Sequence, residues 1–216
     1  MNKKAIKIIL LVLAGIAAVF VLWLIITTAF YAITHPTISL GVLDKPMDNN
    51  LVSAKQIGAY LNDEIQKIDK LGKYDLVIGS IDMKVNREHR GEVTVIFVEK
   101  DNKKPKVIFA YLDTDKGILN KFQDYGRESK LYPGIINLSD WKIDSVEAIK
   151  IAEEFFKDKE GFEYDEIWIQ TYSDALVDYS GGEEEWLVFL TDNKKSIRYY
   201  TRIDPYSGEV VVHSIY

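Results

Sequence analysis

Residues 92–99 read Glu-Val-Thr-Val-Ile-Phe-Val-Glu, and the apolar side chains of Val93, Val95 and Phe97 recur at every second position. In an extended chain, residues two apart point to the same face, so this segment predicts a strand with one apolar face. Strand-like runs lie on either side of it, each separated from it by a turn-like stretch. The runs are 74–85 and 106–112, and the turn-like stretches are 86–91 and 101–105.

An amphipathic helix is predicted ahead of these strands. Ser53, with Gln56 three residues later, has the spacing of a capping box, and Gly72 is a residue that ends helices. The helix must bury its apolar stripe, and an antiparallel sheet with one apolar face is the available partner. The stripe consists of Ala54, Ile57, Leu61, Ile65 and Ile68.

The same succession of a helix and strands recurs in the last third of the chain. Asp144 and Glu147 again have the spacing of a capping box, and Gly161 ends the predicted helix. Residues 204–208, Asp-Pro-Tyr-Ser-Gly, predict a turn because Pro presets φ and Gly accepts a positive φ. The strand-like runs are 167–172, 186–191, 197–203 and 209–215.

Three pairs of sequence landmarks stand at nearly the same offset, which predicts an internal repeat of about 91 residues. Two copies are too few for a solenoid, so we expect two small α+β units in tandem, packed against each other to bury more apolar surface. The landmarks are Ser53 and Ser145, the pairs Tyr74-Asp75 and Tyr164-Asp165, and the turns 112–117 and 203–208.

The N-terminal part has a different composition. Residues 8–33 contain no charged side chain, and as a helix they would extend roughly 39 Å. A bilayer core needs about 20 residues, so the sequence predicts a transmembrane helix over residues 8–33. Residues 34–50 are interpreted as a tether, because His35-Pro36 and Lys45-Pro46 favour extended and turn conformations.

The charges around the apolar run predict its orientation. Lys3, Lys4 and Lys7 precede it, and no Lys or Arg follows until Lys45. The excess of positive charge is expected to stay in the cytoplasm, which places the rest of the chain outside. A cleaved signal peptide is the competing interpretation, but its apolar region usually has only about 7–15 residues.

Composition excludes several classes of function. Residues 34–216 hold all 33 acidic residues and 24 of the 27 basic ones, so their formal charge is −9 (24 − 33). An acidic domain is a poor partner for nucleic acid. The chain has no cysteine, which excludes disulfides, a thiol nucleophile, a cysteine–metal site and a lipid anchor on cysteine.

Few residues suggest catalysis or metal binding. His35, His89 and His213 lie far apart, and no pair has metal-ligand spacing, so each is interpreted as a solvated or packed side chain. A carboxylate site at Asp113 and Asp204 is the alternative to a plain turn role for these residues, and the turn role is favoured. The sequence predicts no catalytic residue, no metal site and no cofactor.

An acidic run near residue 184 also calls for an interpretation. Ser180-Gly181-Gly182 is followed by Glu183-Glu184-Glu185, whose charge would repel a phosphate. The run is interpreted as a solvated hairpin tip rather than a cation site, because a calcium loop spaces its oxygen ligands around a turn. Asp174 and Asp178 offer no pair of carboxyls in evidently different environments.

A set of residues in the second predicted unit matches the pattern of a known domain. They are Trp141, Asp144-Ser145, Glu147-Ala148, Ile151-Ala152, Trp186-Leu187-Val188, Tyr200, Ile203-Asp204-Pro205 and Gly208-Glu209-Val210. In these residues the unit resembles a PepSY domain, well over 142–216 and more faintly over 51–120, where the Pro is missing. The resemblance implies an extracytoplasmic bacterial protein without a catalytic residue set. It also implies control of a peptidase, or other protein binding at the cell envelope.

Together these observations predict an α+β protein with one N-terminal transmembrane helix and two tandem helix-plus-antiparallel-sheet units of PepSY-like type. The expected function is that of a non-enzymatic, membrane-tethered module that binds an envelope protein. Envelope peptidases, which such a module would regulate or inhibit, are one class of expected partner. The alternative is a structural or assembly subunit of a larger membrane complex. The predicted parts are 1–33 (cytoplasmic stub and transmembrane helix), 34–50 (tether), 51–122 (first unit), 123–143 (linker) and 144–216 (second unit).

Overall fold

The computed structural model describes residues 20–23, 26, 38–48, 50–100, 105–127, 136–173 and 184–216. The chain divides into two compact units, residues 1–37 and residues 38–216, and each is described by itself. All the strands and both helices named below belong to residues 38–216, so this unit contains a complete sheet and its hydrophobic core.

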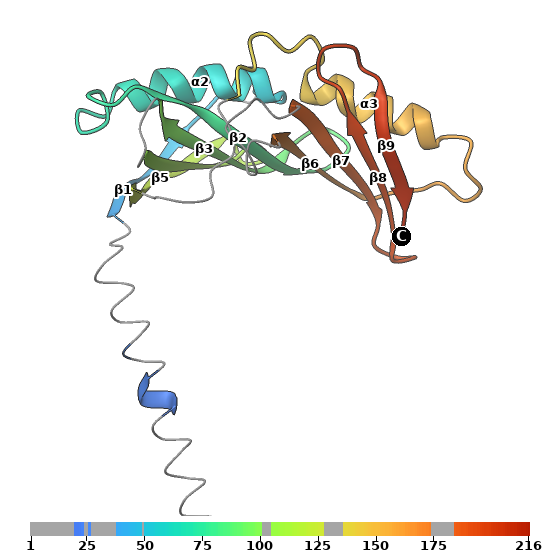
Figure 1. The fold of residues 1–216 in the computed structure, drawn as a ribbon, viewed down its shortest axis with the longest axis horizontal. Coiled ribbons are helices and arrows are strands. Elements are labelled where there is room, and N and C mark those ends of the chain that lie inside the picture. The colour runs from blue at the N-terminus through green and yellow to red at the C-terminus, as the bar shows by residue number, and fades with distance from the viewer. Residues whose placement is uncertain are drawn as a thin grey trace, which may run out of the picture. The chain divides into compact units, whose positions relative to one another are not determined.

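Residues 38–216 form one antiparallel sheet of nine strands (Figure 1). The strands are β1 (Ile38–Pro46), β2 (Leu76–Val85), β3 (Gly91–Glu99), β4 (Lys106–Asp113), β5 (Ile118–Arg127), β6 (Glu166–Ser173), β7 (Glu184–Asp192), β8 (Ile197–Ile203) and β9 (Val210–Ile215). Their order in the sheet is β1-β5-β4-β3-β2-β6-β7-β8-β9. Strands β1 and β9 are therefore its two edges.

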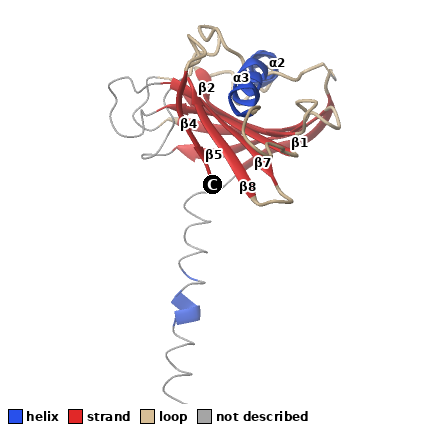
Figure 2. Cartoon of the chain, turned by 90° about the vertical axis from the view of Figure 1, so that its right-hand side faces the viewer, coloured by secondary structure: helices blue, strands red, loops and turns tan. Residues whose placement is uncertain are grey.

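Two helices, α2 (Ala54–Gln66) and α3 (Ser145–Phe156), lie on the same face of the sheet (Figure 2). Each helix precedes four strands that pair in chain order, β2 to β5 after α2 and β6 to β9 after α3. We call the face that they cover the helix face and the opposite one the open face. Each helix packs its apolar stripe on the helix face, because a stripe left in water would forfeit roughly 1.5–3 kcal/mol per large side chain.

The hydrophobic core fills the space between the helices and the sheet. The alternation predicted for residues 92–99 is confirmed, since Val93, Val95 and Phe97 of β3 are buried in this core. At the other end of the core, Trp141 and Trp186 pack edge to face, with 4.7 Å between their ring centroids. Both rings are fully buried, so the segment before α3 is part of the core.

The N-termini of the two helices are capped and meet. Ser53 Oγ accepts the N–H of Gln56 (3.3 Å) and Gln56 Oε1 accepts the N–H of Ser53 (3.2 Å), which confirms the predicted capping box. Helix α3 is capped by Asp144, which accepts the N–H of Ser145 (2.7 Å). Ser145 Oγ in turn accepts the N–H of Ala54 (2.9 Å), so the start of α3 helps to cap α2.

The predicted architecture of two separate helix-plus-sheet units is wrong. Residues Asp82–Val85 of β2 pair with Ile167–Gln170 of β6, and this pairing joins the two halves into one continuous sheet. Two separate sheets would each expose the backbone groups of a first strand, whereas the pairing satisfies them and merges the two cores. The interpretation as tandem PepSY-like units is overturned by this single sheet.

The predicted transmembrane helix also has to be corrected. Within residues 8–33 the structure describes only 20–23 and 26, which are helical, and the rest of the predicted span lies outside the described residues. In the part of the chain that the structure describes, no helix combines the length and the apolar character needed to cross a membrane. The transmembrane element of the fold prediction is therefore not upheld.

The predicted tether and linker contain regular structure. Within 34–50, residues Ile38–Pro46 form strand β1, which pairs with β5. Strand β5 itself runs on to Arg127, which lies inside the predicted linker 123–143. An edge strand pairs on one side only and tolerates Pro, so signals that read as a tether are compatible with β1. Three further residues of the linker are buried: Ile136, Leu138 and Trp141.

Candidate functional site

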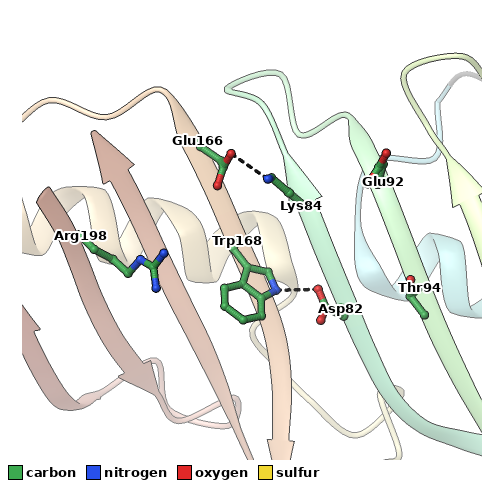
Figure 3. Close-up of a pocket in the computed structure, with 7 residues that line it drawn as sticks. All are labelled: Asp82, Lys84, Glu92, Thr94, Glu166, Trp168 and Arg198. Atoms are coloured by element: carbon green, nitrogen blue, oxygen red, sulfur yellow. Dashed lines mark hydrogen bonds and ion pairs between the residues drawn. The ribbon is translucent and has the colours of Figure 1, made fainter. Parts of the chain in front are cut away.

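The open face of the sheet carries a hollow of about 410 Å³ where the two halves meet (Figure 3). Strands β2, β3 and β6 supply most of its side chains, and β8 supplies one. Polar and charged groups from both halves of the chain therefore converge on this place. The lining residues are Asp82, Lys84, Glu92, Thr94, Glu166, Trp168 and Arg198.

Three charged groups of the hollow, those of Asp82, Lys84 and Glu166, are engaged with neighbours in the hollow itself. Lys84 Nζ lies 3.0 Å from Glu166 Oε2, and Trp168 Nε1 donates a hydrogen bond of 2.6 Å to Asp82 Oδ1. Burial disfavours the charged carboxylate and so raises the pKa of Asp82, while the bond from Trp168 acts in the opposite direction. Both contacts join β2 to β6, so these side chains help to hold the two strands together.

A row of aromatic side chains continues from the hollow across β6, β7 and β8. Trp168 stacks on Phe189 and Phe189 stacks on Tyr200, each pair with 4.9 Å between ring centroids. The three residues stand directly opposite one another in adjacent strands. Cross-strand pairs of this kind stabilise a sheet by roughly 0.2–1 kcal/mol each, which gives the row a structural role.

Among the described residues of 38–216, the exposed large apolar side chains gather at β9. Val211, Val212 and Ile215 are 49%, 38% and 48% exposed. Strand β9 ends the strand order, and residues 210–215 include neither a charged residue nor a Pro. Each exposed large apolar side chain described in this unit lies on β9 or near it in the fold: Phe155, Tyr206, Val211, Val212, Ile215 and Tyr216.

The backbone groups of β9 alternate between its two sides. Arg198 of β8 and Tyr216 exchange two hydrogen bonds, of 3.2 Å and 3.0 Å. Because bonded and non-bonded pairs alternate along an antiparallel ladder, Ser214 belongs to the next pair bonded to β8. The N–H and C=O groups of His213 and Ile215 therefore point away from β8, where an added strand would meet them.

A side chain from α3 extends this edge on the helix face. The ring of Phe155 lies 4.6 Å from the ring of His213, and Phe155 is 37% exposed. A strand added beside β9 would therefore meet an apolar shelf on its helix face as well as backbone groups in the plane of the sheet. Val212 and Ser214 lie on the open face, since their partners in β8 are Arg202 and Tyr200.

The opposite edge, β1, has a different construction. Its pairing with β5 shifts register twice, between Ser39 and Val42 and again between Val42 and Lys45. Asp44 has a positive φ of 32°, and Pro46 carries no N–H. Bulges, a lysine and a proline are devices by which edge strands avoid pairing with other chains. Strand β9 carries one register shift, near its start at Val210, and is regular beyond it.

The three histidines are not brought together among the described residues. His35 lies outside them, and His89 lies in the turn between β2 and β3, where burial lowers the pKa of its imidazole. His213 lies on β9 against Phe155. In the part of the chain that the structure describes, no group of three or more His, Asp or Glu side chains is placed to hold a metal ion.

The two aspartates considered as a carboxylate site lie in separate turns. Asp113 accepts the N–H of Lys116 (2.9 Å) after β4, and Asp204 accepts the N–H of Tyr206 (2.6 Å) after β8. Partial burial acts to raise the pKa of each carboxyl, but hydrogen bonds from the turn outweigh it and lower the pKa of both. These are the contacts of residues that stabilise a turn.

The interpretation of the acidic run as a solvated hairpin tip is wrong for two of its residues. Glu184 and Glu185 begin β7, and Glu185 is only 2% exposed because its carboxylate pairs with Arg202 on the next strand. Asp174, Asp178 and residues 180–183 lie outside the described residues.

The sequence alone indicated no residues for a binding surface. The only signal in β9 was a run of apolar residues without charge.

Comparison with known proteins assigns no family. No family model matches the chain, and no curated protein matches it. Among solved structures, a candidate lipoprotein from Clostridium difficile 630 matches with a TM-score of 0.48 and 12% identity, over 80% of this chain and 100% of that chain. At this similarity the match assigns no function. The resemblance to PepSY domains finds no support in these comparisons.

Proposed function

We propose that this chain is a non-enzymatic protein-binding module that takes an extended segment of a partner protein as an additional strand beside β9. One observation carries the proposal: among the residues that the structure describes, β9 is an uncharged edge strand with no neighbour on its outer side, and its apolar side chains are exposed. In strand addition, main-chain hydrogen bonds supply affinity and pockets for alternate side chains supply specificity. Strand β9 offers both, through its outward backbone groups and through the shelf formed by Phe155.

The geometry of the edge sets the chemistry of the partner segment. Side chains on the helix face would lie beside Phe155, His213 and Ile215, so apolar or aromatic residues are favoured there. Side chains on the open face would lie beside Val212 and Ser214, where small or polar residues fit. The partner segment therefore alternates apolar and polar residues and needs no charge, because β9 carries none.

We place this interaction at the cell envelope, with a membrane-associated chain whose sheet lies outside the cytoplasm. The support is compositional, because residues 8–33 lack charge and the lysines ahead of them are Lys3, Lys4 and Lys7. The acidic character of residues 34–216 argues against nucleic acid as the partner. The partner is then an envelope protein, and peptidases are one class of such proteins.

A non-enzymatic role is supported by the open-face hollow. Its Asp82 carboxylate accepts a hydrogen bond from Trp168, and its Lys84 is paired with Glu166. A general acid or base needs a group held free to meet a substrate, with a pKa near the working pH. The hollow instead uses these groups to hold the two halves of the sheet together.

The test is site-specific photocrosslinking in cells that make the full chain. A photoreactive amino acid at position 215 samples the β9 edge, and one at position 45 samples the β1 edge as a control. We expect crosslinks from position 215 to one extended segment of an envelope protein, and few from position 45. The crosslinked peptide, identified by mass spectrometry, names the partner and its strand.

Two substitutions at His213 then separate the backbone from the side chain. His213→Ala and His213→Pro both remove the imidazole, but only the proline removes the outward N–H. We expect His213→Ala to keep most of the crosslinking and His213→Pro to lose at least about tenfold, or 1.4 kcal/mol. Equal crosslinking in the two variants, or equal crosslinking from positions 45 and 215, would refute strand addition at β9.

A further inference from the structure

We propose that, while no partner is bound, the β9 edge pairs with the β9 edge of a second copy of this chain, antiparallel and centred on Ser214. This inference deepens the proposed function and rests on it, because both use the same open edge. It starts from the part of β9 beyond its register shift, residues 212–216, which is regular and ends in a bonded pair with β8. Ser214 is the middle residue of this five-residue stretch, so the stretch can pair with a second copy of itself about a two-fold axis at Ser214.

The backbone groups fit this register. With Ser214 on the two-fold axis, His213 stands opposite Ile215 of the second copy, and Ile215 stands opposite His213 of the second copy. Both residues direct their N–H and C=O groups outward, so each of these two pairs can exchange two hydrogen bonds. A register centred on Val212 or His213 would instead rely on Val211, which has no partner in β8 because it lies in the register shift.

The side chains fit the same register. On the open face, Val212 would lie beside Tyr216 of the second copy, and these side chains are 38% and 71% exposed in the single chain. On the helix face, His213 would lie beside Ile215 of the second copy, with Phe155 above. Ser214, on the axis, is small enough to face its own copy. Cross-strand pairs of an aromatic and a β-branched side chain are stabilising.

Charge favours a second copy at this place as well. The chain has a formal charge of −6, so two copies repel each other over most surfaces. Residues 210–216 have no charged side chain, so side-chain repulsion is weakest where the two β9 strands would meet. A two-fold interface uses the same surface patch on both subunits, and the symmetric pattern around Ser214 meets that condition.

Self-pairing regulates access to the edge. The second copy and the partner segment occupy the same backbone groups of His213 and Ile215, so they compete. Partner binding must therefore weaken as the concentration of the chain rises and dimers form. The dimer keeps an apolar edge covered until a partner takes its place, which limits the aggregation that an open edge invites.

Disulfide formation tests the register, because the natural chain has no cysteine. In the proposed dimer Ser214 faces its own copy as a non-bonded pair with Cα atoms about 4.5 Å apart, inside the range of about 4.4–6.8 Å for disulfides. The matched control is His213→Cys, whose own copy would lie two residues away along the strand. With residues 38–216, oxidation should link Ser214→Cys at least fivefold more than His213→Cys.

Sedimentation supplies the second readout. The unmodified segment 38–216 should shift from monomer to dimer with concentration, and Ile215→Lys should abolish that shift. A monomer at all concentrations, or equal linking of the two cysteine variants, would overturn the self-pairing. In that case, crosslinks from position 215 to an envelope protein would still support the proposed function. Conversely, the chain could form the dimer while His213→Pro leaves crosslinking to the partner unchanged. That result would refute the proposed function and leave the self-pairing intact.

Discussion

The two edges of the sheet, β1 and β9, solve the same problem in different ways. Within the described part of the chain, each has one row of backbone groups that no other strand meets. Strand β1 shifts register twice, takes a positive φ at Asp44 and ends in Lys45 and Pro46. Strand β9 is uncharged, without Pro, and exposes Val212 and Ile215.

This difference supports the proposal that β9 accepts another strand. An undefended apolar edge is a template for pairing with other chains, and natural proteins usually blunt such edges. In this sheet β1 combines two register shifts with Lys45 and Pro46, whereas β9 has a single register shift near Val210 and neither a charged residue nor a Pro. We therefore read the open edge of β9 as a binding surface, and the following predictions test the contrast between the two edges.

The largest effect is expected from breaking β9 on its inner side. Ser214→Pro removes an N–H that bonds to β8, whereas His213→Pro removes one that points outward. A lost inner hydrogen bond that leaves a backbone acceptor unsatisfied costs about 1–3 kcal/mol. Urea unfolding should show that loss for Ser214→Pro and a loss below about 1 kcal/mol for His213→Pro. Similar losses in both would mean that the two sides of β9 are not distinct.

The next largest effect is expected from giving β9 the defences of β1. Val211→Lys combined with Ile215→Lys places two charges on the exposed edge. A peptide copying residues 209–216 should then bind at least about tenfold more weakly, or 1.4 kcal/mol. The free energy of unfolding should change by no more than about 0.5 kcal/mol per site, because both side chains are exposed. Unchanged peptide binding would count against β9 as the docking strand.

Acid should loosen β1 in particular. Glu64 of α2 lies 2.6 Å from Lys45 of β1 and 2.7 Å from Lys67. Burial acts to raise the pKa of the Glu64 carboxyl, but the two lysines outweigh it and hold the pKa below its usual value. A carboxyl with a depressed pKa stabilises the fold above its unfolded pKa of about 4.3. That stability is lost as the pH falls through the folded pKa.

The acid effect is measured by amide exchange in each strand. Protection factors of β1 amides should fall as the pH is lowered below about 4.3. Those of the β9 amides that bond to β8 should change less. Glu64→Gln should remove the pH dependence and leave the exchange of β9 as it was. A β1 strand that stays equally protected at low pH would show that the ion pair does not hold this edge.

The smallest effect is expected from removing a single defence of β1. Pro46→Val returns one N–H to the end of the strand, but the two register shifts and Lys45 remain. We expect self-association to strengthen by less than about 0.5 kcal/mol, as for other surface changes. Sedimentation of the variant beside the parent measures it. A large gain in association would mean that Pro46 alone protects the edge.

Local features of the fold were predictable from the sequence because they depend on residues close together in the chain. The alternation in 92–99 predicted a strand face, and Ser53 with Gln56 predicted a helix start. The pairing of β2 with β6 joins residues such as Asp82 and Gln170, far apart in the chain, and periodicity does not specify that contact. The continuous sheet was therefore missed.

The candidate site was missed for the same reason. Residues 209–215 were correctly expected to extend as a strand, but no sequence pattern says which strand ends a sheet. Strand β1 was read as a tether because Lys45 and Pro46 are turn and loop signals, and in an edge strand these residues block pairing. Exposure of β9 follows from the strand order alone.

Amide hydrogen exchange at His213 and Ile215 tests the open edge most directly. In segment 38–216, diluted until it is monomeric, both amides should exchange fast, while the amide of Ser214 is protected by β8. Adding the peptide that copies residues 209–216 should slow exchange at His213 and Ile215 and leave Ser214 unchanged. Two results would contradict a β9 that accepts a strand. In one, the amides of His213 and Ile215 are as protected as that of Ser214 in the monomer; in the other, they stay unprotected when the peptide is bound.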